Sequence, residues 1–303
     1  MVHKRKRFTK SRNALFLMTL PFLVMVIMFN YVPLFGWSFA FFNYRPGIPL
    51  SDTPFVGLHY FQFMANRLRD ISRVLTNTFA MGFLGILTAP LPMFTAILIN
   101  AVKITWFRRF TQTTITIPYF VSWVIVYGLA FSLFASQGLV NNLLIQVELI
   151  SRPVNLLGNP DSVWMFQTIL GLWKFLGWNT IIYLAAISGI DEELYQAAEV
   201  DGAGRFQRTW HITLPGLMPT FAVLLLLSIS MILGQGFEQY FVFNNPQVEN
   251  RIEVLDLYVF RIGLATGNFS YGTAIGILKT LVSITFLFTC NWFVKKVRGE
   301  GII

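Results

Sequence analysis

Two lysines stand inside long apolar runs of this sequence, where a charged side chain is costly. Lys174 lies within residues 162–190 and Lys279 within residues 270–294, and neither run contains another Lys, Arg, Asp or Glu. A charge at the centre of a bilayer costs about 2.5–3.5 kcal/mol on insertion scales, so such a residue is a functional candidate. The alternative is that each lysine reaches toward water or pairs with a neighbouring helix.

Several catalytic patterns are absent from the sequence. It has no G-x-x-x-x-G-K-[ST] phosphate loop, no H-E-x-x-H and no G-x-S-x-G. The histidines, His3, His59 and His211, are far apart, and Cys290 is the single cysteine, which excludes an intrachain disulfide and a cysteine metal cluster. We therefore predict that the chain is not an enzyme, that it holds no metal, and that any ATP hydrolysis belongs to another polypeptide.

The longest polar island between two apolar runs covers residues 191–219 and has clear helix signals. Asp191 can cap a helix whose first turn holds two glutamates, where acids suit the helix dipole. Gly202 can end this helix in a left-handed conformation, and a second short helix can cover residues 206–212. Pro215 suits the first turn of the next apolar helix.

Small residues in this island would allow another protein to approach its backbone closely. Ala197, Ala198, Gly202 and Ala203 supply these positions, and the surrounding acids and arginines would fix the register of a contact. An ordinary membrane-surface loop with two amphipathic turns is the other interpretation, and the residues alone leave both open.

Composition and hydropathy place the chain in a membrane. Of its 303 residues, 55% are hydrophobic and 12% are charged, against about 25% charged in soluble proteins. A span needs about 20 apolar residues. Six runs satisfy this length, and prolines at 21, 33, 90, 92 and 118 predict kinks in them. The runs are 13–44, 74–102, a part of 110–147, 162–190, 212–237 and 270–294.

The distribution of Lys and Arg predicts the orientation. With the N-terminus inside, the inner segments carry 14 of these residues and the longer outer segments carry 7. Both termini and the polar island would then be cytoplasmic in a multi-pass protein of the inner (plasma) membrane. The net charge of +9 therefore follows the topology and does not indicate nucleic-acid binding. The outer loop over residues 45–73, rich in proline and aromatic residues, is expected to be a folded cap.

The polar island resembles the cytoplasmic signature loop of ATP-binding-cassette (ABC) importer permeases, E-A-A-x₃-G-x₉-I-x-L-P. Here Gln196-Ala197-Ala198 is followed by Gly202 and then by Ile212-Thr213-Leu214-Pro215. Gln196 replaces the usual glutamate, which removes any salt bridge made at that position. In this family the loop docks on the ATPase subunit, so the resemblance implies a coupling role for a set of residues. They are Glu193, Gln196, Ala197, Ala198, Asp201, Gly202, Ala203, Leu214 and Pro215.

Further segments resemble the LplB-type oligosaccharide permeases, which belong to the carbohydrate-uptake branch. These segments are Asn30–Gly36, Phe55–Leu58, Ile117–Trp123 and Tyr271–Gly276. The resemblance covers nearly the whole chain and implies an all-α membrane protein, a type I ABC importer permease with a cytoplasmic coupling helix. One six-helix transmembrane domain would cover residues 14–294, with the coupling loop at 191–215 and cytoplasmic tails at 1–13 and 295–303.

A sugar path is the functional expectation for the polar residues of the spans. Aromatic rings stack on the apolar faces of sugars, amides bond sugar hydroxyls, and lysines would attract carboxylates, so an acidic oligosaccharide is one possible substrate. The candidate residues are Trp173, Lys174, Trp178, Asn179, Gln235, Gln239, Tyr240 and Lys279.

The resemblance also implies partners. They are a second, homologous permease in a heterodimer, a cytoplasmic ATPase dimer that binds ATP and Mg²⁺, and an extracytoplasmic solute-binding protein. The permease chain itself is expected to bind no cofactor. A secondary transporter driven by an ion gradient and an intramembrane enzyme are the alternatives. The first would carry acidic residues or broken helices at membrane depth, and no Asp or Glu lies in the middle of a predicted span.

Overall fold

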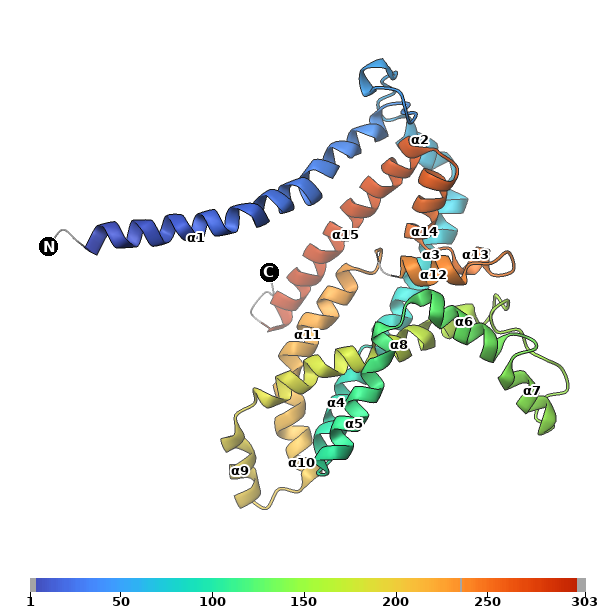
Figure 1. Ribbon diagram of the computed structural model, residues 1–303. Coiled ribbons are helices and arrows are strands. Elements are labelled where there is room, and N and C mark those ends of the chain that lie inside the picture. The colour runs from blue at the N-terminus through green and yellow to red at the C-terminus, as the bar shows by residue number, and fades with distance from the viewer. Residues whose placement is uncertain (1–3, 235, 299–303) are drawn as a thin grey trace. The chain divides into compact units, whose positions relative to one another are not determined.

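The computed structural model describes residues 4–234 and 236–298, which form helices, turns and one isolated β-bridge. The order of the helices can be followed in Figure 1. The helices are α1 (Lys4–Val26), α2 (His59–Asn66), α3 (Leu68–Thr88), α4 (Leu91–Ala101), α5 (Thr105–Thr116), α6 (Trp123–Phe134), α7 (Leu139–Gln146), α8 (Val163–Ser188), α9 (Glu192–Val200), α10 (Arg205–Arg208), α11 (Leu214–Ser230), α12 (Phe237–Phe243), α13 (Glu249–Ile252), α14 (Leu255–Phe260) and α15 (Phe269–Arg298).

Six helical segments of the described chain are long and apolar enough to cross a membrane, as predicted. They are Ala14–Phe41, Leu68–Ala101, Trp123–Gln146, Val163–Ser188, Arg205–Ser230 and Phe269–Thr289. They correspond to the six apolar runs of the sequence, and the all-α class is confirmed. The chain divides into two compact units, residues 1–67 with 259–278 and residues 68–258 with 279–303.

Proline determines where several spans change geometry, because it lacks a backbone N–H and clashes with the preceding helical turn. The second span is divided between α3 and α4, with Pro90 directly before α4 and Pro92 in its first turn. A 3₁₀ turn over Ile117–Phe120 contains Pro118, and a 3₁₀ stretch over Val32–Phe41 begins with Pro33. Pro21, in contrast, lies inside the continuous α1.

The first unit contains residues 45–67 of the loop that was expected to fold as a cap, whereas residues 68–73 form the start of α3 in the second unit. Phe42 and Phe55 form the isolated bridge, and the Tyr60 hydroxyl donates to Asn43 Oδ1 at 2.9 Å. Ser270, at the start of α15, accepts from the Tyr44 amide at 2.9 Å and donates to the Phe42 carbonyl at 2.7 Å. These contacts give this part of the loop a defined structure, and its external position stays a prediction.

In the second unit, α8 is the central helix and contacts α3, α4, α5 and α11. Two clusters of buried apolar side chains pack around it. One includes Trp123, Phe166 and Phe243, and the other includes Tyr183 and Leu217. The polar groups of α8 are therefore held between packed helices.

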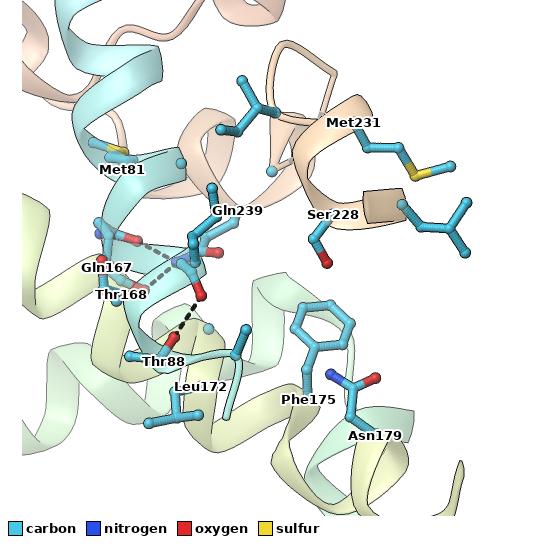
Figure 2. A pocket seen from close by; sticks show the side chains of 18 of the residues that line it. Met81, Thr88, Gln167, Thr168, Leu172, Phe175, Asn179, Ser228, Met231 and Gln239 are labelled. Atoms are coloured by element: carbon cyan, nitrogen blue, oxygen red, sulfur yellow. Dashed lines mark hydrogen bonds between the residues drawn. The ribbon is translucent and has the colours of Figure 1, made fainter. Parts of the chain in front are cut away.

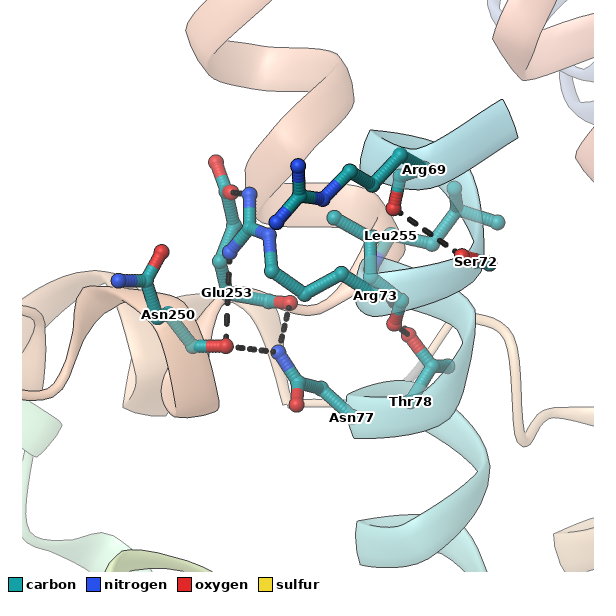
Figure 3. Close-up of polar contacts among 9 residues, drawn as sticks. Arg69, Ser72, Arg73, Asn77, Thr78, Asn250, Glu253 and Leu255 are labelled. Atoms are coloured by element: carbon teal, nitrogen blue, oxygen red, sulfur yellow. Dashed lines mark hydrogen bonds and ion pairs between the residues drawn. The ribbon is translucent and has the colours of Figure 1, made fainter. Parts of the chain in front are cut away.

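A polar network joins α3 to the segment before α14 in the same unit (Figure 3). Arg73 Nη2 lies 2.7 Å from Glu253 Oε2, and the Glu253 side chain is 1% exposed. Asn77 Nδ2 donates to the carbonyls of Asn250 and Glu253, both at 3.0 Å, and Thr78 accepts from the Leu255 amide at 2.9 Å. Buried backbone groups need such partners, so the network fixes this non-helical connection against α3.

Candidate functional site

The polar island begins with the helix that its residues predict. Asp191 Oδ1 accepts a hydrogen bond from the Glu193 amide at 3.0 Å and caps α9. Gly202 has a φ of +77°, and the Ala203 amide donates to the Ala198 carbonyl at 2.8 Å. The left-handed glycine thus closes the C-terminus of α9, as predicted.

Two interactions fold the second half of the island back onto the first, and a third caps its short helix. Arg208 Nη1 lies 3.0 Å from Glu199 Oε2, and the hydroxyls of Tyr195 and Thr213 are 2.9 Å apart. Gln207 Oε1 accepts from the Gly204 amide at 2.8 Å, which caps α10. The island is therefore a defined helix–turn–helix, with α10 followed by a π-helical turn over Thr209–Thr213.

The outward surface of this helix–turn–helix suits a protein contact. Among the residues predicted to couple, Glu193, Gln196, Ala197, Asp201, Gly202 and Pro215 are exposed, whereas Ala198, Ala203 and Leu214 are half-buried. Two apolar side chains beside them project into solvent, Val200 at 88% exposure and Phe206 at 78%. Apolar side chains at such exposure, between charged neighbours, are typical of a surface that another protein covers.

The two ends of the island leave the membrane helices at one place. A methyl group on Gly216, in the first turn of α11, would lie 2.7 Å from Cδ1 of Ile190, which directly follows α8. The Ile190 side chain therefore packs directly against the Gly216 backbone.

A cavity of about 620 Å³ lies in the second unit among α3, α8, α11 and α12 (Figure 2). Its wall combines aromatic rings with amides and hydroxyls, a composition that suits a polar organic ligand. Among the described lining residues, Glu238 is the one carboxylate and none is Lys or Arg. The polar and aromatic lining residues include Thr78, Trp123, Gln167, Thr168, Phe175, Asn179, Ser228, Phe237, Gln239 and Tyr240.

Two buried glutamines join α12 to α8 at this cavity. Gln239 Nε2 donates to both the backbone oxygen and Oε1 of Gln167, each at 2.8 Å. Gly236, with a φ of +86°, directly precedes α12, and a methyl group there would lie 2.4 Å from the Tyr240 ring. Burial raises the pKa of Tyr240 to about 12, so its phenol stays protonated and available as a hydrogen-bond donor.

Three of the residues predicted for the path come together at this cavity: Asn179, Gln239 and Tyr240. Trp173 and Trp178 are 44% and 40% exposed and do not line it. Lys174 and Lys279 also lie outside its wall. Gln235 lies outside the described residues.

Each lysine has a defined partner. Lys174 Nζ donates to three backbone carbonyls of the interruption between α5 and α6, and Lys279 Nζ pairs with Asp256 Oδ1 of α14. The alternative interpretation from the sequence, pairing with a neighbouring helix, therefore describes both contacts.

Sequence reasoning missed most of the α8 residues in the wall of the cavity. Gln167, Gly171, Phe175 and Asn179 follow one another at intervals of four and share one face of the helix. Starting from Asn179, this interval alone would have identified the other three. Lys174 lies about 140° from Asn179 around the helix but only about 20° from Gln167, so it stands at the edge of the face that lines the cavity.

Known proteins resemble this chain over nearly its full length. The family model described as binding-protein-dependent transport system inner membrane component matches residues 81–299. Protein LplB of Bacillus subtilis strain 168 is 38% identical over 97% of this chain and 92% of that protein. The polygalacturonan/rhamnogalacturonan transport system permease protein YteP of the same organism is also 38% identical, over 99% of this chain and 94% of that protein.

Solved structures give the same relationship. A chain of a bacterial ABC transporter involved in the import of the acidic polysaccharide alginate superposes with a TM-score of 0.86 and 31% identity, covering 98% of this chain and 100% of that one. A chain of the bacterial alginate ABC transporter in complex with an alginate pentasaccharide-bound periplasmic protein also has a TM-score of 0.86 and 31% identity, over 98% and 99%.

Proposed function

This chain belongs to the family of binding-protein-dependent transport system inner membrane components, and on that premise we propose that it is the permease subunit of an ATP-driven oligosaccharide importer. The observation that carries the proposal is the full-length likeness, in sequence and fold, to a chain of an alginate ABC transporter. The six spans and the helix–turn–helix at 191–215 form a type I importer permease with its coupling segment.

Acidic oligosaccharides are the favoured substrates. The relative YteP is named for polygalacturonan and rhamnogalacturonan, and the alginate transporter takes another acidic polysaccharide. In this chain the described cavity wall carries one carboxylate and many amides and hydroxyls. The cavity is therefore suited to sugar hydroxyls, and the positive charges that recognise carboxylates would come from a second permease or from the binding protein.

The coupling role of the 191–215 segment follows from its surface. Its exposed small residues, flanked by Val200 and Phe206, would fill a groove on an ATPase that binds ATP and Mg²⁺ for the whole importer. The permease chain has no phosphate loop, so it contributes contact and sugar binding. Both termini and this segment are cytoplasmic, because Lys and Arg concentrate on that side.

The importer works by alternating access in this proposal. ATP binding closes the ATPase dimer, which moves the docked segment together with α8 and α11. The motion opens the cavity toward an extracytoplasmic solute-binding protein, and a second permease completes the path.

Uptake into proteoliposomes tests this function. The chain is reconstituted with its partner permease, its ATPase and the solute-binding protein, and uptake of radiolabelled oligogalacturonides is measured with and without internal ATP. Uptake that needs ATP and the binding protein is the expected result. Uptake driven by a proton or sodium gradient without ATP would contradict the proposal.

Crosslinking tests the docking surface separately. In a Cys290→Ser background, a cysteine at exposed Ala197 is expected to crosslink to single cysteines in the ATPase groove, with a yield that changes on addition of ATP. A cysteine at exposed Ser51, in the loop predicted to be external, is the control. Equal crosslinking yields to the ATPase from the cysteines at positions 197 and 51 would rule out this docking site.

A further inference from the structure

The chain is interrupted between α5 and α6, opposite the middle of α8. The 3₁₀ turn over Ile117–Phe120 ends at Val121, and the backbone of Val121 and Ser122 is extended, with ψ of 131° and 153°. In a continuous helix the Ile125 amide would bond the Val121 carbonyl, but here it donates to Ser122 Oγ at 3.4 Å. The interruption therefore leaves carbonyl oxygens that need donors from elsewhere.

Lys174 supplies those donors. Its Nζ donates to the Tyr119 carbonyl at 3.0 Å and to the Val121 carbonyl, and also to the Pro118 carbonyl at 3.2 Å, which accepts from the Val121 amide as well. An ammonium group has three N–H donors, and these three bonds use all of them. The residue is 5% exposed, so its charge is enclosed by the interruption and has no donor left for a ligand.

One face of α8 is shaped to hold the interruption. A methyl group on Gly177 would lie 2.1 Å from the Ile115 carbonyl oxygen, so the two backbones approach as closely as a glycine allows. Trp178 stacks on Tyr119 with ring centroids 4.3 Å apart and planes 7° apart. Lys174, Gly177 and Trp178 follow the i, i+3, i+4 spacing of one helix face.

The same ammonium lies beside two rings of the cavity wall. Nζ of Lys174 is 5.3 Å from the ring centroid of Trp123 and 5.9 Å from that of Phe175, both within cation–π range. Trp123 is the first residue of α6, directly after the interruption, and is 5% exposed. The direction of the Trp123 ring therefore depends on how the interruption is held.

We propose that Lys174 is a positioning residue: its ammonium supplies the donors that the backbone does not give to the Tyr119 and Val121 carbonyls, and it thereby fixes Trp123 and Phe175 in the wall of the cavity. The consequence for transport rests on the proposed function, because it treats the cavity as part of the sugar path. Lys174 then acts equally on neutral and acidic sugars, in contrast to attraction of a carboxylate.

Two measurements on the assembled importer test the proposal. Lys174→Met is expected to lower uptake of a neutral and an acidic oligosaccharide by the same factor, about tenfold per assembled complex, the value of one charge-assisted hydrogen bond. Lys174→Arg keeps the charge and the donors and should restore most of the rate. Lys103→Met, at an exposed lysine, is the control and should change neither rate.

The second measurement follows Trp123 directly and needs no sugar. In complexes labelled with fluorotryptophan, the ¹⁹F resonance that is missing from Trp123→Phe is that of Trp123. We expect this resonance to move in Lys174→Met, to return in Lys174→Arg and to stay in place in Lys103→Met. If Lys174→Met does not assemble, Lys174→Gln, with two N–H donors and no charge, is examined by the same two measurements.

The outcomes separate the possible roles of Lys174. Loss of acidic uptake alone would assign charge recognition to Lys174 and overturn the proposal. A smaller amount of complex, with an unchanged rate per complex and an unmoved Trp123 resonance, would reduce Lys174 to a stability residue and also overturn it. The remaining outcome is a wild-type importer that transports no sugar, while the Trp123 resonance still shifts in Lys174→Met and returns in Lys174→Arg. In that case the proposed function fails and the positioning role stands.

Discussion

Lys279 of α15 and Asp256 of α14 form an ion pair in which the side chains are 23% and 19% exposed. Gly234, after α11, lies beside the pair, since a methyl group there would be 3.4 Å from Lys279 Nζ. The charge in the last span is thus neutralised by a carboxylate from outside the six candidate spans. A lysine that looks isolated in its own apolar run is paired in the fold.

Removal of one member of this pair should lower the stability of the complex more than removal of both members. Asp256→Asn or Lys279→Met leaves one enclosed charge without a partner and is expected to cost about 3 kcal/mol. The double variant should lose clearly less stability than the two single variants lose in sum. Thermal unfolding of the purified complex measures all three, and strictly additive losses would contradict a direct pairing.

Asn77 should be a strong stability determinant of α3. Asn77→Ala removes a hydrogen bond to the Asn250 carbonyl and one to the Glu253 carbonyl, and Asn77 itself is 2% exposed. We expect a loss of about 1–3 kcal/mol from the two buried hydrogen bonds that the variant lacks. Asn142→Ala is the matched control, because exposed Asn142 donates one bond, to the Gln137 carbonyl, and should change stability by less than about 0.5 kcal/mol. Similar losses for both variants would argue against the network.

Gly202 and Gly204 offer a matched test of the coupling segment. Gly202 has a φ of +77° with open space around it, so Gly202→Ala strains the backbone by about 1–2 kcal/mol without a clash. Gly204 has a φ of −67°, which alanine adopts freely. We expect Gly202→Ala to reduce substrate-stimulated ATP hydrolysis several-fold and Gly204→Ala to leave it unchanged. The turn would have no role in coupling if both variants hydrolyse ATP at the wild-type rate.

Asn179 should contribute to sugar binding at the cavity. Loss of one or two hydrogen bonds to sugar hydroxyls in Asn179→Ala is expected to raise the half-saturation concentration for uptake about three- to tenfold. Asn100→Ala, at an exposed asparagine of α4 that does not line the cavity, should leave it unchanged. An unaltered half-saturation concentration in Asn179→Ala would argue that the cavity does not bind the transported sugar.

Features determined by neighbouring residues could be predicted from the sequence. The cap at Asp191, the left-handed Gly202 and the interruption at Pro118 need no information from distant parts of the chain. The six spans follow in the same way from the length of apolar runs. The helix–turn–helix at 191–215 was therefore predicted from its own residues, and its coupling role stays a prediction.

The wall of the cavity could not be predicted in the same way, because it depends on which face of each helix points inward. Apolar runs with a small amphipathic signal do not reveal that face, so Lys174 and Asn179 were grouped although they point in different directions. The partners of Lys174 lie 53–56 residues earlier in the chain, and that of Lys279 lies 23 residues earlier. Such pairings become visible only after the helices have packed.

The contact between Ile190 and Gly216 has a mechanical consequence. Both ends of the segment at 191–215 join the spans at one place, where Ile190 meets Gly216. A force on the segment would therefore move α8 and α11 together and would not separate the two helices. α8 carries Lys174, which contacts the interruption between α5 and α6, and Asn179, which lines the cavity. A movement of α8 would therefore displace these contacts and the cavity wall together. A larger residue at position 216 would have to displace the Ile190 side chain, so it would alter this contact between α11 and the residue that follows α8.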